Sequence, residues 1–196
     1  MKEYPTSKIR NIALVGHGGT GKTSLVEAMI FNTGVLKRLG KVDDGNTVSD
    51  FQPEEIKKKI TISSTIVPCE YREHKINVLD TPGYADFYFE VIGALNVVDS
   101  MLVMLSATAG VEVQTEIVWN DFPAIPKIAY INKMDRENAD FYKALNELKD
   151  TFSDNIVPVQ LPIGAEQNFK GVVDLIQMKA LLIESGSGKI TVADIP

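Results

Sequence analysis

Residues 16–23 read GHGGTGKT and fit the phosphate-binding pattern G-x-x-x-x-G-K-[ST]. An apolar run over residues 9–15 precedes them, and a helix-forming run over residues 24–31 follows. Glycines let backbone N–H groups approach phosphate oxygens, and the N-terminus of the new helix adds a favourable dipole. We expect Lys22 to reach the β- and γ-phosphates and Thr23 to bind Mg²⁺ through its hydroxyl. This strand–loop–helix segment therefore predicts a nucleotide phosphate site.

A second motif, DTPG, closes another strand-like run at residues 80–83. In a doubly wound sheet, parallel strands end at the same crevice, so this motif should face the phosphate loop. Asp80 can hold Mg²⁺ directly or through water. Gly83 can bring its backbone N–H to a γ-phosphate, because it has no side chain to clash. The four residues alone are equally typical of a simple turn, and the phosphate loop before them favours a γ-phosphate sensor.

A third motif, NKMD at residues 132–135, follows the apolar run of residues 127–131. Asp135 can accept hydrogen bonds from the guanine N1–H and 2-amino group, and adenine has neither donor. The stem of Lys133 can lie along the base plane, and Asn132 can tie the base to the phosphate loop. By itself NKMD is typical of a polar turn. As the third motif in this order it indicates a guanine clamp.

Two weaker signals complete the predicted site. Thr61 is the best candidate for a second hydroxyl ligand of Mg²⁺, although a threonine that begins a strand is an equally good interpretation. Gly164 and Ala165 follow the apolar run of residues 156–163 and could offer a backbone N–H to the guanine O6.

The elements that must position these motifs alternate between strand-like and helix-like runs. This alternation predicts an α/β fold with a doubly wound, mostly parallel sheet and helices on both faces. The six expected strands are residues 11–15, 60–71, 75–79, 100–105, 127–131 and 156–163, of which 100–105 and 127–131 read as buried. The expected helices are residues 23–31, 87–98, 114–121 and 138–152.

Local details refine this prediction. The short link at residues 72–74 forces the strands on either side of it into an antiparallel pair. Pro68 marks the first of them as an edge strand, since proline cannot donate to a ladder. Residues 34–59 read as a long polar loop, which in a compact domain is usually functional. Residues 169–183 read as short strands around a turn, and residues 185–188 as a hairpin loop.

Composition restricts the class of protein. The chain has 196 residues, 44% hydrophobic and 23% charged, with a net charge of −6. These values are ordinary for a globular domain and argue against a broad nucleic-acid-binding face, so we expect no sequence-specific DNA binding. Cys69 is the only cysteine, so no intrachain disulfide forms, and we expect a small strand residue in a cytoplasmic protein. No apolar stretch reaches membrane-spanning length, and the N-terminal residues lack a secretory pattern.

Together the motifs make the chain resemble the GTPase domain of the translational GTPases, most closely elongation factor G. The resemblance rests on GHGGTGKT, ITI at residues 60–62, DTPGYADF at 80–87, INKMD at 131–135 and PIGAEQNFKGVVDL at 162–175. It implies a P-loop GTPase fold, GTP or GDP with Mg²⁺, ribosome-stimulated hydrolysis and a role in translation. It also implies an N-terminal fragment: residues 1–165 would form the GTP-binding domain, and residues 166–196 would begin an inserted subdomain.

Three positions depart from the family pattern. Tyr84 stands where the family carries the histidine that helps to place the attacking water, and Gly19 stands where its phosphate loop has aspartate. Lys58 and Lys59 replace the usual Arg-Gly before Ile-Thr; the run of lysines at 57–59 is either a solvated face or a contact with ribosomal RNA. These departures suggest a paralogue that binds GTP normally and hydrolyses it slowly or in response to a different trigger.

The function classes that remain are a GTPase enzyme, a GTP-dependent binding switch with weak hydrolysis, and a ribosomal-protection factor. Residues 132–135 disfavour an ATPase or a kinase. The predicted catalytic residues are Lys22, Gly83 and Tyr84. The predicted metal ligands are Thr23, Thr61 and Asp80. The predicted nucleotide contacts are Gly16, His17, Gly18, Gly19, Thr20, Gly21, Lys22, Thr23, Asp80, Thr81, Pro82, Gly83, Tyr84, Asn132, Lys133, Met134, Asp135, Gly164 and Ala165.

Overall fold

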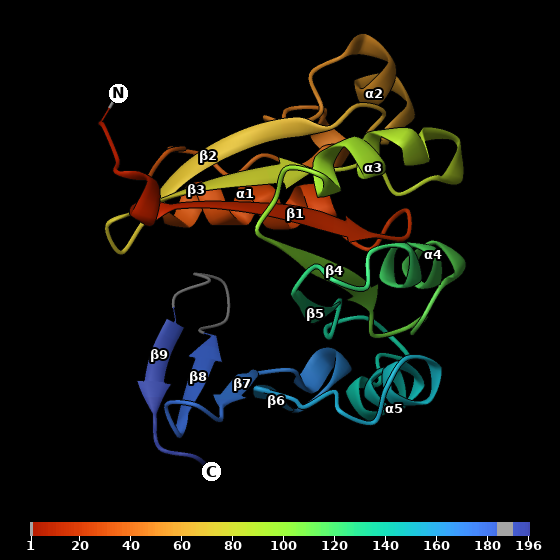
Figure 1. Ribbon diagram of the computed structural model, residues 1–196. Helices are drawn as coiled ribbons and strands as arrows, with labels where there is room; N and C mark the ends of the chain where they lie inside the picture. The colour runs from red at the N-terminus through yellow and green to blue at the C-terminus, as the bar shows by residue number, and fades with distance from the viewer. Residues whose placement is uncertain (1, 184–189) are drawn as a thin grey trace. The chain divides into compact units, whose positions relative to one another are not determined.

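The computed structural model describes residues 2–183 and 190–196. Within these residues the larger sheet has five strands in the order β2-β3-β1-β4-β5 (Figure 1). The strands are β1 (Ile9–Gly16), β2 (Thr65–Tyr71), β3 (His74–Asp80), β4 (Ser100–Ser106) and β5 (Lys127–Asn132). Strand β1 pairs in parallel with β3 and β4, whereas β2 is antiparallel to β3. This mixed, mostly parallel sheet confirms the predicted α/β class.

The helices follow the predicted alternation. They are α1 (Lys22–Asn32), α2 (Pro53–Lys58), α3 (Tyr88–Leu95), α4 (Val113–Asp121) and α5 (Phe141–Thr151). Short 3₁₀ turns cover Thr6–Lys8, Val42–Asp44, Ala85–Phe87 and Glu166–Asn168. None of the helices in the described residues is long and apolar enough to cross a bilayer.

The hairpin of β2 and β3 has the predicted antiparallel direction. Its register pairs Tyr71 with His74, so that Arg72 and Glu73 form a two-residue turn. Both turn residues have positive φ, 45° and 61°, as tight hairpin turns require. Strand β2 lies at the end of the strand order, which confirms the edge position predicted from Pro68.

Helix α1 packs on the β1–β3 part of the sheet through a small apolar core. The buried members of this core are Leu14, Val26, Ile30, Val67, Cys69 and Val78. Each large aliphatic side chain buried here contributes about 1.5–3 kcal/mol. Cys69 lies in β2, as predicted for a small strand residue, and the structure adds that it belongs to this core. This packing fixes the C-terminal end of β1 close to the start of α1, and the phosphate loop is the turn between them.

Residues 34–59, predicted as a loop, contain helix α2. The signals for this helix are local: Gln52 is its N-cap, Pro53 occupies the first helical position, and Glu55 completes a capping box with Gln52. The helix ends at Lys58, and its C-cap Lys59 has a left-handed φ of 56°. The low apolar periodicity of the segment concealed a helix of less than two turns.

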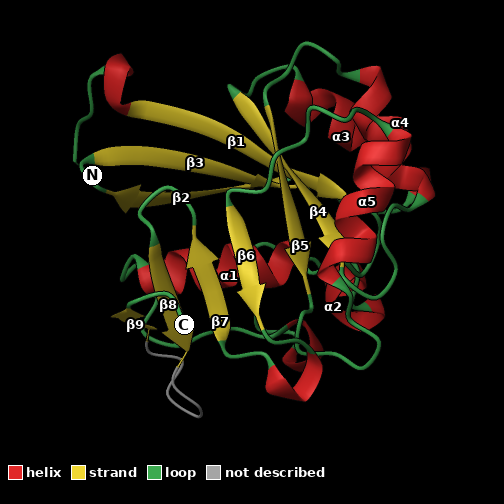
Figure 2. Cartoon of the chain, turned by 90° about the horizontal axis from the view of Figure 1, so that it is seen from below, coloured by secondary structure: helices red, strands yellow, loops and turns green. Residues whose placement is uncertain are grey.

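The predicted sixth strand belongs to a second sheet, which has four strands in the described residues, and not to the larger sheet. Strand β6 (Gln160–Ile163) pairs antiparallel with β7 (Gly171–Asp174), followed by β8 (Lys179–Ile183) and β9 (Ile190–Ala193). Figure 2 shows β6, β7 and β8 as successive neighbours. The chain turns at Gly164, which has a φ of 78°, and β7 returns along β6 with Ile163 paired to Gly171. The predicted strands within 169–183 are confirmed, and the predicted hairpin loop at 185–188 lies outside the described residues.

Strand β5 was wrongly predicted to be buried on both faces. Its side chains alternate between half-buried and exposed, and Ile128 is 61% exposed. The reason is that β5 is the last strand of the five-stranded sheet. An apolar run does not distinguish a central strand from an edge strand.

The chain divides into two compact units. The first comprises residues 1–105 and 112–130, and the second comprises residues 106–111 and 131–196. The phosphate loop and the DTPG motif belong to the first unit, whereas NKMD and Gly164 belong to the second. The boundary at residues 165/166 between a GTP-binding domain and an inserted subdomain stays a prediction.

Candidate nucleotide site

The phosphate loop turns between β1 and α1 through glycines in left-handed or extended positive-φ conformations. Gly16 has a φ of 132°, and a Cβ atom there would collide with the carbonyl oxygen of Met104 on β4. Gly21 has a φ of 99° and is the N-cap of α1. Only glycine adopts such angles without strain. The glycines of the motif are thus required by the backbone itself.

Lys22 lies inside this loop. Its Nζ donates to the carbonyl oxygens of Gly16 at 3.0 Å and His17 at 2.9 Å. Burial lowers the pKa of Lys22 to about 8, and the nearby carboxylate of Asp80 opposes that change. An amine that is desolvated in this way is attracted strongly to an incoming phosphate.

The side chains around the loop hold its shape. The hydroxyl of Thr20 donates to the carbonyl of His17 at 2.9 Å. The ring of His17 faces Glu112, with 3.6 Å between Nε2 and Oε1. Gly19 has a φ of 76°, and a Cβ atom there would have no heavy atom within 4 Å. The space at Gly19 could thus hold a side chain, but its left-handed backbone favours glycine.

The DTPG segment lies directly against the phosphate loop. The hydroxyl of Thr81 donates to the carbonyl of Leu14 on β1 at 2.6 Å. A Cβ atom on Gly83 would collide with Nζ of Lys22 and would lie 2.7 Å from the backbone nitrogen of Gly18. The ends of β1 and β3 therefore lie side by side, as predicted. The lack of a side chain at Gly83 allows this close approach.

Tyr84, the next residue, covers the phosphate loop at Gly18. A Cβ atom on Gly18 would lie 2.8–3.1 Å from three atoms of the Tyr84 ring. The tyrosine remains 44% exposed. The aromatic ring thus occupies the space that a side chain at position 18 would fill.

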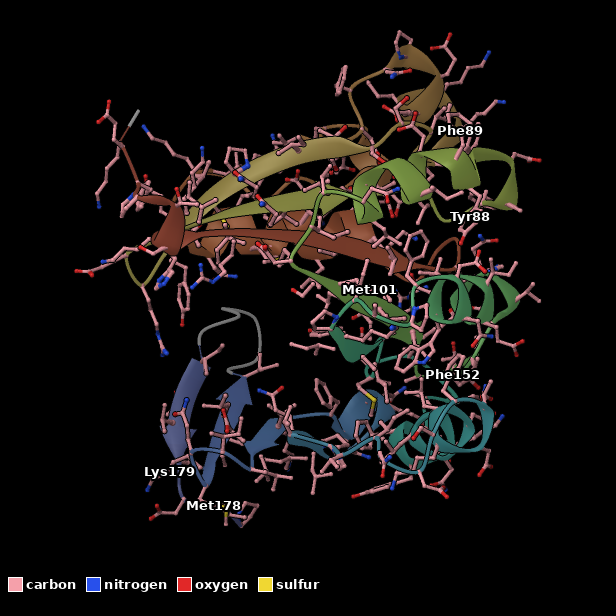
Figure 3. The ribbon with its side chains drawn as sticks, in the orientation of Figure 1. Tyr88, Phe89, Met101, Phe152, Met178 and Lys179 are labelled. Atoms are coloured by element: carbon pink, nitrogen blue, oxygen red, sulfur yellow. The ribbon has the colours of Figure 1, made fainter. Side chains whose placement is uncertain are left out.

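Helix α3, which follows Tyr84, is tied to α4 by its first residue. The hydroxyl of Tyr88 donates to Oδ2 of Asp121 at 2.7 Å. Burial, with Asp121 as a second cause, raises the pKa of this phenol. Figure 3 shows Tyr88 and its exposed neighbour Phe89 at the start of the helix. This contact fixes the end of the loop that carries Gly83 and Tyr84.

A buried cluster of hydroxyls and carboxylates adjoins the start of α1. The hydroxyls of Thr23 and Thr61 lie 3.1 Å apart. Thr61 donates to Oδ1 of Asp50 at 2.8 Å. Ser49 donates to Oδ2 of Asp80 at 2.6 Å. The three predicted metal ligands thus share one cluster with Ser49 and Asp50.

Ser49 and Asp50 are site residues that no sequence motif indicated. Both are buried, although they lie in a polar segment without periodicity. Burial raises the pKa of Asp50, and the hydrogen bond from Thr61 opposes that rise. The sequence TVSDF contains no known motif. The burial of Asp50 therefore cannot be predicted locally, because it arises only when this segment folds back onto α1.

Asp80 is the most strongly perturbed carboxylate of the cluster. It is completely buried, and burial raises its pKa to about 6, against hydrogen bonds from Ser49 and Thr23. Among the described residues, Oδ1 of Asp80 has no hydrogen bond of good geometry. A buried acceptor without a partner is costly unless a ligand satisfies it. Hydroxyl and carboxylate oxygens are the ligands that Mg²⁺ prefers, so the residues present fit this ion.

The NKMD segment forms a separate cluster with Gly164 and Ala165 in the second unit. Met134 and Ala165 belong to an apolar cluster with Ala107 and Ala139. The backbone nitrogen of Glu166 donates to the carbonyl of Met134 at 2.8 Å. The structure therefore brings together the two segments that were predicted to share the base.

Within this cluster the side chains divide between anchoring and exposed positions. Met134 is buried, so its side chain anchors the loop. Lys133 has a left-handed φ of 63°. The carboxylate of Asp135 is 70% exposed and is 4.0 Å from the nearest nitrogen of Arg136. An exposed carboxylate on an anchored loop is free to accept hydrogen bonds from a base.

Comparison with known families agrees with this geometry. The family model described as the elongation factor Tu GTP-binding domain matches residues 7–186 of the 196. The chain belongs to this GTP-binding domain family. Membership confirms the predicted P-loop GTPase fold.

Individual members of the elongation factor family are similar over nearly the whole chain. Elongation factor G of Gluconobacter oxydans (strain 621H) is 46% identical over 182 residues, which cover 92% of this chain and 26% of that protein. Elongation factor G of Granulibacter bethesdensis is 45% identical over 188 residues, covering 95% and 27%. A crystal structure of a protein from Thermus thermophilus has a TM-score of 0.90 and 37% identity, covering 97% and 28%.

These comparisons confirm the resemblance to elongation factor G. The chain spans about a quarter of the length of the relatives that it matches. The similarity therefore describes a GTP-binding domain of this family.

Proposed function

We propose that this domain binds GTP and GDP with Mg²⁺ and hydrolyses GTP to GDP and phosphate. The observation that carries the proposal is the cluster at the phosphate loop. There a buried amine, Lys22, the backbone of Gly83, two hydroxyls 3.1 Å apart and the carboxylate of Asp80 meet. Phosphoryl transfer needs positioning and charge stabilisation more than covalent chemistry, and these groups supply both.

Each of these residues has a distinct role in the proposal. Lys22 neutralises charge on the β- and γ-phosphates, and the N–H of Gly83 donates to the γ-phosphate. Thr23, Thr61 and Asp80 hold Mg²⁺, and Mg²⁺ supplies charge stabilisation for the transferred phosphoryl group when bound. Tyr84 borders the same position and can donate or accept through its hydroxyl.

The base is recognised by Asp135, with Asn132, Lys133 and the backbone at Gly164 and Ala165 as supporting contacts. The exposed carboxylate of Asp135 accepts from guanine N1–H and the 2-amino group. An adenine would leave this carboxylate without partners, so ATP binds more weakly by several orders of magnitude.

The relatives named elongation factor G indicate where this chemistry acts. We infer that the domain works in the cytoplasm as part of a translation factor and that its GTP hydrolysis is stimulated by the ribosome. Loss of the γ-phosphate would release the segments that carry Thr61 and Gly83, which is how such loops act as switches.

One observation favours a second candidate, a GTP-dependent binding switch with weak hydrolysis. Where the family has histidine, the Tyr84 ring lies against Gly18, so a group suited to proton transfer is absent from that position. General acid–base assistance is typically worth about 10²–10⁴ in rate. The two candidates therefore predict the same affinity and different turnover.

Calorimetry and single-turnover kinetics test both candidates. We expect Mg²⁺-dependent binding of GTP and GDP without measurable binding of ATP, and hydrolysis that ribosomes accelerate. Tyr84→His should raise the stimulated rate, and Tyr84→Phe should test the hydroxyl alone. Failure to bind guanine nucleotide would overturn the proposal; binding without ribosome-stimulated hydrolysis would select the switch.

A further inference from the structure

Glu27 is a buried carboxylate in the middle of α1 that none of the motifs includes. It is 1% exposed. Its Oε2 accepts from the backbone nitrogen of Gly40 at 3.1 Å, and its Oε1 accepts from that of Val48 at 2.5 Å. One side chain on the helix that follows the phosphate loop thus holds two points of the long segment 34–59.

The arrangement is specific to a carboxylate. A buried charge is costly unless it is hydrogen-bonded, and bonds from N–H groups to a charged acceptor are roughly twice as strong as neutral ones. A Cβ atom on Gly40 would lie 2.5 Å from Oε2 of Glu27 and 2.8 Å from the carbonyl of Asn46. The segment therefore approaches Glu27 as closely as glycine permits.

The residues next to Val48 connect this contact to the candidate metal cluster. Ser49 donates to Asp80, and Asp50 accepts from Thr61, whose hydroxyl lies 3.1 Å from that of Thr23. A shift of the backbone at Val48 would move Ser49 and Asp50 with it. Glu27 is thus connected, through the backbone of Val48, to two side chains that surround the predicted Mg²⁺ ligands.

The far end of the segment has its own support. Glu55 is also buried, and its Oε1 accepts from the backbone nitrogens of Ile62 at 2.9 Å and Ser63 at 3.1 Å. This contact fixes the residues that follow Thr61. Two buried carboxylates outside the phosphate site therefore fix this part of the chain: Glu27 from α1 holds residues 40 and 48, and Glu55 from α2 holds residues 62 and 63.

We propose that Glu27 is a positioning residue that stabilises the arrangement of residues 40–50 needed for Mg²⁺ and a nucleoside triphosphate. The inference rests on the proposed function. In this arrangement Thr23 and Thr61 can reach one cation, and only GTP adds a γ-phosphate beside that cation and Gly83. A residue that stabilises one state of a segment raises affinity only for the ligand that selects that state. Glu27 therefore sets the preference for GTP over GDP.

The test compares Glu27→Gln with wild type in the whole chain. The glutamine keeps the shape but presents an NH₂ group to a backbone N–H. We expect affinity for a non-hydrolysable GTP analogue with Mg²⁺ to fall by roughly tenfold or more, with GDP affinity changed by less than about threefold. Without nucleotide, we expect faster tryptic cleavage in the segment, at Lys37, Arg38 and Lys41.

Two further variants keep the test decisive. Gly40→Ala disturbs the same contact from the loop side and should produce the same selective loss without altering α1. Glu54→Gln changes an exposed carboxylate of the same segment and should leave both affinities unchanged. Equal losses for GTP and GDP, or no loss in either test variant, would overturn the role of Glu27. A wild type that binds neither nucleotide would instead overturn the proposed function, and cleavage that is equal in all variants would overturn Glu27 independently of binding.

Discussion

The hydroxyl oxygens of Thr23 and Thr61 lie 3.1 Å apart, although 38 residues separate them in the chain. Thr23 belongs to α1, and Thr61 follows α2 at the end of the long polar segment. Their approach brings the phosphate loop and this segment to a common point. Two such hydroxyls and the carboxylate of Asp80 can together bind one cation that prefers oxygen ligands.

Removing one of these hydroxyls should weaken triphosphate binding selectively. Thr61→Val keeps the shape, removes a predicted metal ligand and leaves Asp50 without its donor. We expect affinity for Mg²⁺ and a GTP analogue to fall by roughly tenfold or more, because a lost contact of this kind is worth about 1–3 kcal/mol. GDP affinity should change little. Thr61→Ser, which retains the hydroxyl, is the control in the same calorimetric titration.

Removing the carboxylate of Asp135 should abolish base selectivity. Asp135→Ala leaves the guanine N1–H and 2-amino group without an acceptor, so GTP affinity should fall towards that of ATP. Competition between the two nucleotides measures this ratio. Asp154→Ala, at an exposed aspartate of the same unit, should keep the preference for GTP. A preference for GTP that survives in Asp135→Ala would refute the clamp.

The contact between Gly18 and Tyr84 should appear as a coupling energy. Gly18→Ala places a methyl group against the Tyr84 ring, and we expect a loss of about 1 kcal/mol in the free energy of unfolding. In a Tyr84→Ala background the same change should cost less than about 0.5 kcal/mol, as a double-mutant cycle would show. Gly93→Ala is the control, since a Cβ atom there has no heavy atom within 4 Å. Additive effects would mean that the ring does not pack on Gly18.

The buried carboxylate of Asp80 should make stability depend on pH in a defined direction. Its pKa is raised by burial to about 6 from an ordinary value of 3.8, so ionisation above pH 6 destabilises the nucleotide-free chain. At about 1.4 kcal/mol per pKa unit, Asp80→Asn should be more stable than wild type by ~3 kcal/mol at pH 7. This difference should shrink as the pH falls through 6 towards 4, where the wild-type carboxylate is protonated.

Urea denaturation of both proteins in EDTA, at intervals between about pH 4.5 and 8, measures that difference. Asp154→Asn, an exposed site, should show no such dependence. The same Asp80→Asn protein should bind Mg²⁺ and GTP more weakly, because the amide is a poorer ligand. A stability difference that is constant with pH would mean that Asp80 is not the titrating group.

The sequence predicted those parts of the fold and site that depend on local pattern. The phosphate loop requires glycine at Gly16 and Gly21 for backbone reasons, and the structure has positive φ at both. Pro68 correctly indicated an edge strand, because proline has no backbone N–H to donate to a neighbouring strand. Helix α2 was missed although Gln52, Pro53 and Glu55 carry ordinary start signals, since so short a helix shows little apolar periodicity.

Other features depend on contacts between distant residues and leave no local pattern. The role of Asp50 depends on Thr61 and Thr23, and that of Glu27 depends on the path of residues 40–48. The strand at 160–163 was recognised, but its sheet was wrong, because strand propensity does not choose a partner. The position of strand β5 along the chain was predicted correctly, but its burial was not. The burial of a strand also depends on its neighbours in the sheet, which strand propensity does not choose.

Pro68 has a further consequence, for the behaviour of the chain in concentrated solution. The outer edge of β2 has no neighbouring strand among the described residues, and such an edge is a template on which another molecule can add a strand. A proline in the middle of that edge removes an N–H group from the row and interrupts the template. We therefore expect this residue to protect the domain from aggregating edge to edge, whatever nucleotide it holds.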